Sequence, residues 1–262
     1  MAMPVPIPMP KIFLSVSLFI VLFCSAGYAS ELRVLCYNIH IGIGMDKKLD
    51  LERTAKLIKE QKPDLVALQE VDRNANRTEK QDQAALLEQL TGLKAVYGKT
   101  LNHASGGEYG IAILSRFPVK ESKMTPLPLQ EGYEPRGLLE VEVEFADNQR
   151  LRFANTHLCH RSEEGRVQQV KRINDLLKDA GLAILCGDFN APPESTTIKT
   201  ALEQWTDAGD SSPTFSSTNP TRKIDYIFYK PTSRLKVKEM KVLQDNITSD
   251  HLPVLVVFEV LP

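Results

Sequence analysis

Short apolar runs typical of buried strands recur along this chain, and the polar residues at their boundaries share one kind of chemistry. A single Asn or Asp beside a strand usually forms a turn by bonding its own backbone. Six boundaries here carry acids, amides or histidines: Tyr37-Asn38-Ile39-His40, Gln69-Glu70, Asn155-Thr156-His157, Gly187-Asp188-Phe189-Asn190, Ile224-Asp225-Tyr226 and Ser249-Asp250-His251. Six independent turns would seldom share that chemistry, so we expect these side chains to meet at one edge of a sheet scaffold.

Strand and helix patterns alternate along the chain. Residues 139–145 alternate apolar residues with glutamate, which is typical of a strand with one face buried and one in water. Helices are predicted over residues 50–61, 81–90 and 162–178, with a short one near 194–202. Other strands are predicted at 32–37, 65–68, 111–114, 151–156, 182–186, 224–229, 235–237 and 254–260. This mixture predicts one domain in which two sheets pack face to face, with helices outside.

Residues 1–29 have the pattern of a secretory signal peptide. Lys11 supplies a positive charge, residues 12–24 are almost all apolar, and small residues precede a polar start at Ser30. The apolar stretch is short for a membrane span, which needs about 20 residues. We expect cleavage after Ala29, secretion or release into the periplasm, and a folded domain over residues 30–262. An uncleaved segment that holds the protein at a membrane is the alternative.

Charge and cysteine content narrow the class of protein. The formal net charge is −1, which lacks the basic excess of proteins that grip long nucleic acids through their backbone. A nuclease acting on short substrates is still compatible with this balance. Cys36, Cys159 and Cys186 follow the signal segment at mostly apolar positions, so we expect buried thiols rather than a disulfide framework, although one bridge is compatible with the sequence.

The boundary residues suit a metal site of one kind. Asn38, Glu70, Asp188, Asn190 and Asp250 are hard oxygen donors, which match Mg²⁺, Mn²⁺ or Ca²⁺ rather than zinc. Clustered carboxylates repel one another unless a cation lies between them. The same boundaries hold two histidines able to move protons near neutral pH, His157 and His251.

In this order the motifs resemble those of the endonuclease/exonuclease/phosphatase family, which includes DNase I. The resemblance covers about Leu32 to Val260. It rests on Tyr37-Asn38-Ile39-His40, Leu68-Gln69-Glu70-Val71, Gly110 to Arg116, Arg136, Asn155-Thr156-His157-Leu158, Gly187-Asp188-Phe189-Asn190, Ile224-Asp225-Tyr226-Ile227 and Ser249-Asp250-His251. It implies an α+β fold, a four-layer α/β/β/α sandwich of two mixed β-sheets packed face to face, with the site at one end.

The resemblance implies a hydrolase that attacks phosphoric esters with an activated water. Asn38, Glu70 and Asp250 become metal-site residues, with Glu70 as the principal ligand, and Mg²⁺, Mn²⁺ or Ca²⁺ as the cofactor. His251 becomes the base that activates the water, held and polarised by Asp225. A His–Asp pair of this kind fixes the imidazole tautomer and supports the imidazolium.

The remaining residues are expected to contact the substrate. Asp188 and Asn190 orient the nucleophile and a phosphate oxygen, and His157 lies near the scissile phosphate as a hydrogen-bond donor or general acid. Arg136 either pairs with phosphate or anchors the strand that follows it. Glu108 is considered as a partner that orients His157.

Two positions depart from the family pattern, because Ile111 stands where relatives often have asparagine and Cys159 where they often have a polar residue. Neither belongs to the expected metal set, so the departures concern substrate contacts.

Several substrates are compatible with this core. A secreted phosphodiesterase or phosphomonoesterase is the leading interpretation, and its substrate is a nucleic acid, a phospholipid such as sphingomyelin, or an inositol or sugar phosphate. A non-catalytic binding module of the same fold is the other class. It predicts the loss of a residue such as Glu70, Asp188, Asp225, Asp250 or His251, and all are present. We expect a monomer without an obligate protein partner.

The signal peptide gives a first testable prediction. When the chain is expressed with its native start, the mature protein should begin at or near Ser30 and appear outside the cytoplasm, because the apolar segment directs export. Mass spectrometry of the purified protein measures the start. Intact residues 1–29 on cytoplasmic protein would show that the segment is not a signal peptide.

Overall fold

Two six-stranded sheets form the centre of the computed structural model, which describes residues 1, 3, 30–145 and 149–261. The predicted signal peptide lies outside the continuous described ranges. In the first sheet, with the order β11-β12-β1-β2-β4-β3, the strands are β1 (Ser30–Asn38), β2 (Leu65–Arg73), β3 (Lys94–Asn102), β4 (Glu108–Ser115), β11 (Leu235–Val242) and β12 (Val254–Val260). In the second, with the order β5-β6-β7-β8-β10-β9, they are β5 (Val119–Pro126), β6 (Gly137–Phe145), β7 (Gln149–His157), β8 (Ala183–Asp188), β9 (Thr206–Asp207) and β10 (Asp225–Lys230).

Both sheets are mixed. β1 runs parallel to β2 in the first sheet and β7 parallel to β8 in the second, while the remaining neighbours are antiparallel. The carboxyl ends of these parallel pairs therefore point to the same end of their sheets, and that is where the candidate site residues lie.

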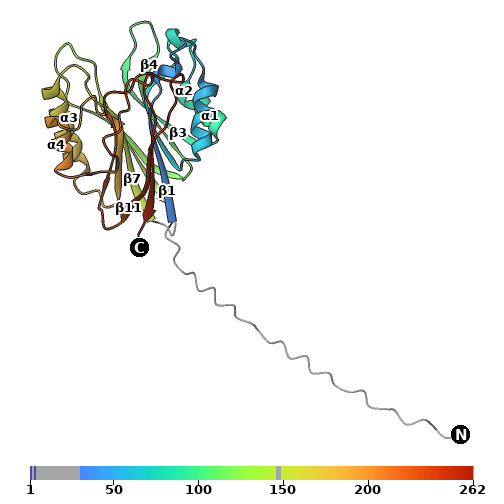
Figure 1. Cartoon of the computed structure of the whole chain (residues 1–262). Helices are drawn as coiled ribbons and strands as arrows, with labels where there is room; N and C mark the ends of the chain where they lie inside the picture. The colour runs from blue at the N-terminus through green and yellow to red at the C-terminus, as the bar shows by residue number, and fades with distance from the viewer. Residues whose placement is uncertain (2, 4–29, 146–148, 262) are drawn as a thin grey trace.

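Helices cover the outer faces of the sheets, α1 (Leu51–Gln61) and α2 (Gln83–Thr91) on one side and α3 (Glu163–Leu177) and α4 (Thr196–Leu202) on the other (Figure 1). Short 3-10 turns are η1 (His40–Gly42) and η2 (Asn76–Thr78). Asp50 and Ser162 cap α1 and α3 by accepting bonds from the backbone N–H of Arg53 and Gly165. The four-layer α/β/β/α sandwich is confirmed. Among the described residues, none of the helices is both long enough and apolar enough to cross a membrane.

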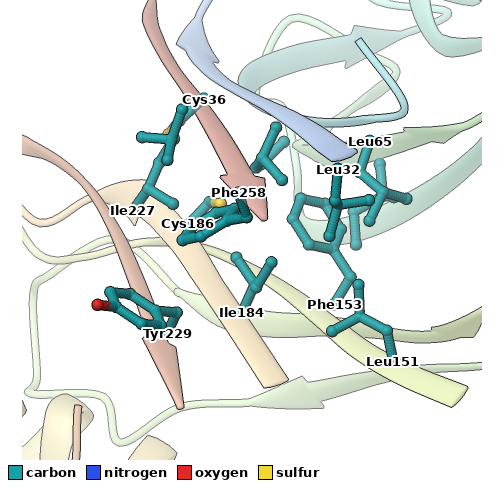
Figure 2. Close-up of a cluster of buried hydrophobic side chains, with 14 of the residues drawn as sticks. Leu32, Cys36, Leu65, Leu151, Phe153, Ile184, Cys186, Ile227, Tyr229 and Phe258 are labelled. Carbon is teal, nitrogen blue, oxygen red and sulfur yellow. The ribbon is translucent and has the colours of Figure 1, made fainter. Parts of the chain in front are cut away.

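Apolar side chains fill the space between the layers. Between the sheets lie Leu32, Leu65, Phe153, Ile184 and Phe258, which Figure 2 shows packed against one another with Cys36 and Cys186. Separate apolar clusters lie between each sheet and its helices. All three described cysteines are free and buried, as expected from their apolar sequence positions.

The sequence missed three strands, β3, β5 and β9, and each lies at the edge of a sheet. β5 exposes most of its residues, including Lys120, Glu121 and Lys123, so it has no alternating apolar face for a sequence pattern to detect. Charged edge strands protect a sheet from pairing with other chains. Their formation depends on a neighbouring strand, which the local pattern does not encode.

The core between the sheets gives a stability prediction. Phe258 is fully buried, so Phe258→Ala removes a large apolar contact from both sheets and should lower the free energy of unfolding by about 3–5 kcal/mol. Urea denaturation measures the change. The control is Leu202→Ala, a truncation at a residue that is 47% exposed, which should change stability by less than about 1 kcal/mol. Equal losses in the two variants would contradict the proposed packing.

Candidate active site

The candidate site residues meet at one end of the sandwich, although they come from both sheets. Asn38 ends β1, while His157 and Asp188 end the parallel strands β7 and β8. Asp225 lies near the start of the predicted strand 224–229, and it begins β10. Because β10 is antiparallel to β8, with Asp225 paired to Asp188, the start of β10 lies at the same edge.

Glu70 reaches the site by a different route from the one predicted. The sequence indicated that its strand ends at this residue, but β2 continues to Arg73. The pairing with β4 shifts register between Leu68 and Val71, and Glu70 adopts a left-handed backbone with φ 56°. A β-bulge redirects a side chain in this way, and non-glycine residues in left-handed conformations are concentrated at functional sites.

The most definite pair in the site is His251 with Asp225. His251 Nδ1 lies 2.9 Å from Asp225 Oδ2, and both side chains are buried. Burial by itself lowers the pKa of His251, but the carboxylates of Asp225 and Asp188 outweigh it and raise the pKa to about 10. The pair joins the two sheets, since Asp225 begins β10 and His251 precedes β12.

Thr214, which sequence reasoning missed, holds this pair in place. Its hydroxyl donates to Asp225 Oδ2 at 2.6 Å and accepts from the backbone N–H of Ile224 and Asp225. The same carboxylate oxygen therefore binds both Thr214 and His251, which fixes the orientation of the imidazole. A threonine 11 residues before its partner gives no local sequence signal.

Asn38 lies among three other site residues. Its side-chain nitrogen is 3.1 Å from Glu70 Oε1, 3.1 Å from Asp188 Oδ2 and 3.4 Å from His251 Nε2. Burial and the charge of Asp225 raise the pKa of Asp188 to about 7. The amide donor thus lies between two carboxylates that would otherwise repel each other.

His157 contributes from the second sheet. Its Nε2 lies 3.4 Å from Asp188 Oδ2, while Nδ1 has no hydrogen-bond partner within the part of the chain that the structure describes. Burial and then the charge of Arg136 lower the pKa of His157 well below its ordinary value, so the ring is neutral. The prediction that Glu108 orients His157 is wrong, because Glu108 forms ion pairs with Arg73 and Lys99.

A cleft of about 340 Å³ opens onto part of this cluster, including Glu70, His157, Asp188 and His251. Asn190, with a left-handed backbone at φ 51°, bonds Asp188 Oδ1 through its N–H and the carbonyl of Leu158 through its side chain. The guanidinium of buried Arg136 lies 3.0 Å from Glu134 Oε1 and 3.4 Å from His160 Nδ1. Arg136 lines the cleft and also directly precedes β6. The cleft is lined by Glu70, Tyr109, Glu134, Arg136, His157, His160, Asp188, Asn190, Phe215, Arg222, Ile224, Asp250 and His251.

Five of these lining residues escaped the sequence analysis: Tyr109, Glu134, His160, Phe215 and Arg222. Each lies outside the strand-boundary motifs or beside them, so only the folded chain shows that they share the cleft. The two departures from the family pattern, Ile111 and Cys159, are buried and do not line it.

The chemistry of the donors fits an oxygen-coordinated divalent cation. Asp188, Asp225 and His251 offer atoms within 4.8 Å of one another, but they are buried and engaged in the hydrogen bonds given above. Glu70 and Asp250 are only half-buried and line the cleft with carboxylates. The hard cations Mg²⁺, Mn²⁺ and Ca²⁺ prefer such oxygens.

Comparison with known proteins agrees with this geometry. Residues 35–251 match the sequence model of the Endonuclease/Exonuclease/phosphatase family. The chain belongs to the endonuclease/exonuclease/phosphatase family. A search of the curated proteins finds no significant match.

Solved structures show the same fold. An endonuclease/exonuclease/phosphatase from Beutenbergia cavernae aligns with a TM-score of 0.77 and 26% identity over 88% of this chain and 72% of that one. A mannosyl-6-phosphatase from Bacteroides thetaiotaomicron gives 0.71 and 20%, over 87% and 99% of the two chains. The human nocturnin catalytic domain with bound sulfate gives 0.68 and 20%, over 88% and 95%.

The His251–Asp225 pair gives a prediction about pH. Because the folded-state pKa of His251 is raised, its contribution to stability is complete below the unfolded pKa of about 6.5. That contribution is lost as the pH rises toward the folded value of about 10. Asp225→Asn removes the attracting charge and should lower the pKa of His251 and reduce the loss of stability between pH 7 and 10.

Urea unfolding in EDTA, with NMR titration of the histidines, measures both effects. The matched control is Asp175→Asn at an exposed position of α3, which should leave the pH dependence as in the original protein. An unchanged pKa of His251 in Asp225→Asn would show that the two side chains are not coupled.

Proposed function

We propose that this family member is a divalent-metal-dependent hydrolase of phosphoric esters. The observation that carries the proposal is the buried Asp225–His251 pair at 2.9 Å, which opens onto a cleft shared with carboxylates, an amide and a second histidine. A positioned base, oxygen ligands for a cation and neutral donors are what water attack on a phosphoric ester requires.

His251 acts as the general base in this proposal. Its Nδ1 is held by Asp225, which leaves Nε2 of the neutral ring to accept a proton from the attacking water. Asp225 and Asp188 raise the pKa of His251 to about 10, and a cation held by Glu70 and Asp250 would lower that pKa and favour the neutral ring. The Asp225 carboxylate stabilises the resulting imidazolium, and Thr214 keeps that carboxylate in place. General-base assistance of this kind contributes about 10²- to 10⁴-fold to the rate.

Asn190, His157 and Arg136 bind the phosphoryl group. Negative charge spreads over its oxygens during attack, and these residues line the cleft with N–H donors. Neutral His157 serves as a donor rather than as a charged acid. Asp188 positions Asn190 by accepting its backbone N–H and faces the side-chain nitrogen of Asn38.

Glu70 and Asp250 would hold the cation, and Asn38 would orient Glu70 through the 3.1 Å contact. Mg²⁺, Mn²⁺ or Ca²⁺ bound there supplies positive charge that stabilises the developing charge on phosphate oxygens. The cation would supply this positive charge, and the protein's own side chains supply the other roles.

Small phosphate esters are the favoured substrates. The cleft of about 340 Å³ and the net charge of −1 suit a compact ligand better than a long nucleic acid. The fold neighbour named mannosyl-6-phosphatase supports a sugar phosphate, and the sulfate in nocturnin supports recognition of a tetrahedral anion. A phospholipid diesterase is the alternative, because Leu129 is 53% exposed in the proline-rich loop before Arg136. The proposal also includes export of the protein from the cytoplasm and a monomeric state.

Removal of the metal and of its main ligand tests the function. With p-nitrophenyl phosphate, bis(p-nitrophenyl) phosphate and the candidate natural esters as substrates, EDTA should abolish turnover and Mg²⁺ or Mn²⁺ should restore it. Glu70→Gln should weaken metal activation, and His251→Ala should lower kcat by about 10²-fold or more because the base is lost.

The control for these variants is Glu121→Gln, an exposed carboxylate on edge strand β5. It should keep full activity, and circular dichroism should show that all the variants fold. Full turnover in excess EDTA would overturn the metal assignment, and a normal pH profile for His251→Ala would overturn the assigned base.

A further inference from the structure

Arg222 is fixed next to the catalytic pair by the backbone. Phe215 and Arg222 exchange backbone hydrogen bonds of 3.0 Å in both directions, and Phe215 also forms a β-bridge with His251. Backbone pairing therefore connects Arg222 to His251 through one intervening residue, Phe215.

The side chains also lie in the order Arg222, Phe215, His251. The Arg222 guanidinium lies 4.6 Å from the centre of the Phe215 ring, and that ring lies 4.8 Å from the ring of His251. A planar guanidinium stacks well on an aromatic face, and stacking restricts its rotation. Arg222 is exposed and lines the cleft, so the stacked group is accessible to a ligand.

Arg222 and the other arginine in the cleft, Arg136, differ in whether a carboxylate lies beside the guanidinium. Arg136 is buried and lies 3.0 Å from Glu134. For Arg222, no carboxylate of residues 30–145 or 149–261 lies within 4.0 Å of its guanidinium nitrogens. Its N–H fork is thus held in position without an acidic partner.

We propose that Arg222 binds a second anionic group on the substrate, a phosphate or a carboxylate near the ester that is hydrolysed. This proposal rests on the proposed function and narrows its substrate to small phosphate esters that carry two anions. A guanidinium binds both groups through paired N–H bonds, and its pre-oriented position lowers the entropy lost on binding. Zwitterionic phospholipids lack the second net negative group and are disfavoured.

Competition measurements test the proposal whether the enzyme prefers monoesters or diesters. The reporter is whichever of p-nitrophenyl phosphate and bis(p-nitrophenyl) phosphate is turned over with Mg²⁺. The competitors are glycerol 3-phosphate with one anion, 3-phosphoglycerate with an added carboxylate, and propane-1,3-diol bisphosphate with an added phosphate. One or both doubly anionic compounds should compete about 10- to 100-fold more strongly than glycerol 3-phosphate, and the stronger of the two identifies the second group.

Arg222→Gln should remove this preference, and Arg222→Lys should retain part of it because the charge remains without the fork. The control is Arg172→Gln, at an exposed arginine of α3, which should keep the full preference. Metal chelation by the competitors is the same for every variant and so cancels in the comparison. Equal competition by all three compounds, or a preference unchanged in folded Arg222→Gln, would overturn the proposal alone. If neither reporter is turned over, the proposed function is overturned as well.

Discussion

The contact between His251 and Asp225 is the interaction on which the site depends, because it connects the second sheet to the segment that leads into the first. Asp225 begins β10 in the second sheet, and His251 precedes β12 in the first. The packed core between the sheets therefore sets the 2.9 Å distance from Nδ1 to Oδ2. A small shift of one sheet against the other would break the pair, which explains why a rigid apolar core lies directly beneath a polar site.

Placing carboxylates together in a buried position is unfavourable, and the arrangement offsets that cost in specific ways. Asp188 accepts from Asn190 and faces the Asn38 nitrogen, while Asp225 accepts from Thr214 and pairs with His251. Asp188 and Asp225 Oδ2 thus have partners, as low-dielectric surroundings require, while Asp225 Oδ1 has none in the described part of the chain. The raised pKa of His251 in this arrangement means that a cation bound at the neighbouring carboxylates would compete with its proton, so metal binding and base activity are linked.

Most central elements could be predicted from local pattern, while the edges could not. The helix caps Asp50 and Ser162 and the alternation of β6 are encoded by neighbouring residues. Edge strand β5 has no apolar face of its own, and the bulge at Glu70 arises from pairing with β4. Such features depend on residues distant in sequence, so a local pattern does not contain them.

The sequence by itself determined the chemistry available to this protein: hard oxygen donors and two histidines at strand boundaries, in the order of the family motifs. Only the tertiary structure decided how that chemistry is arranged. It placed Asn38 between Glu70 and Asp188, assigned Thr214 to Asp225, and stacked Arg222 on Phe215 beside His251. The physical reason is that hydrogen bonds, burial and pKa shifts act across a few ångströms of space, and strand order brings together residues that the sequence separates.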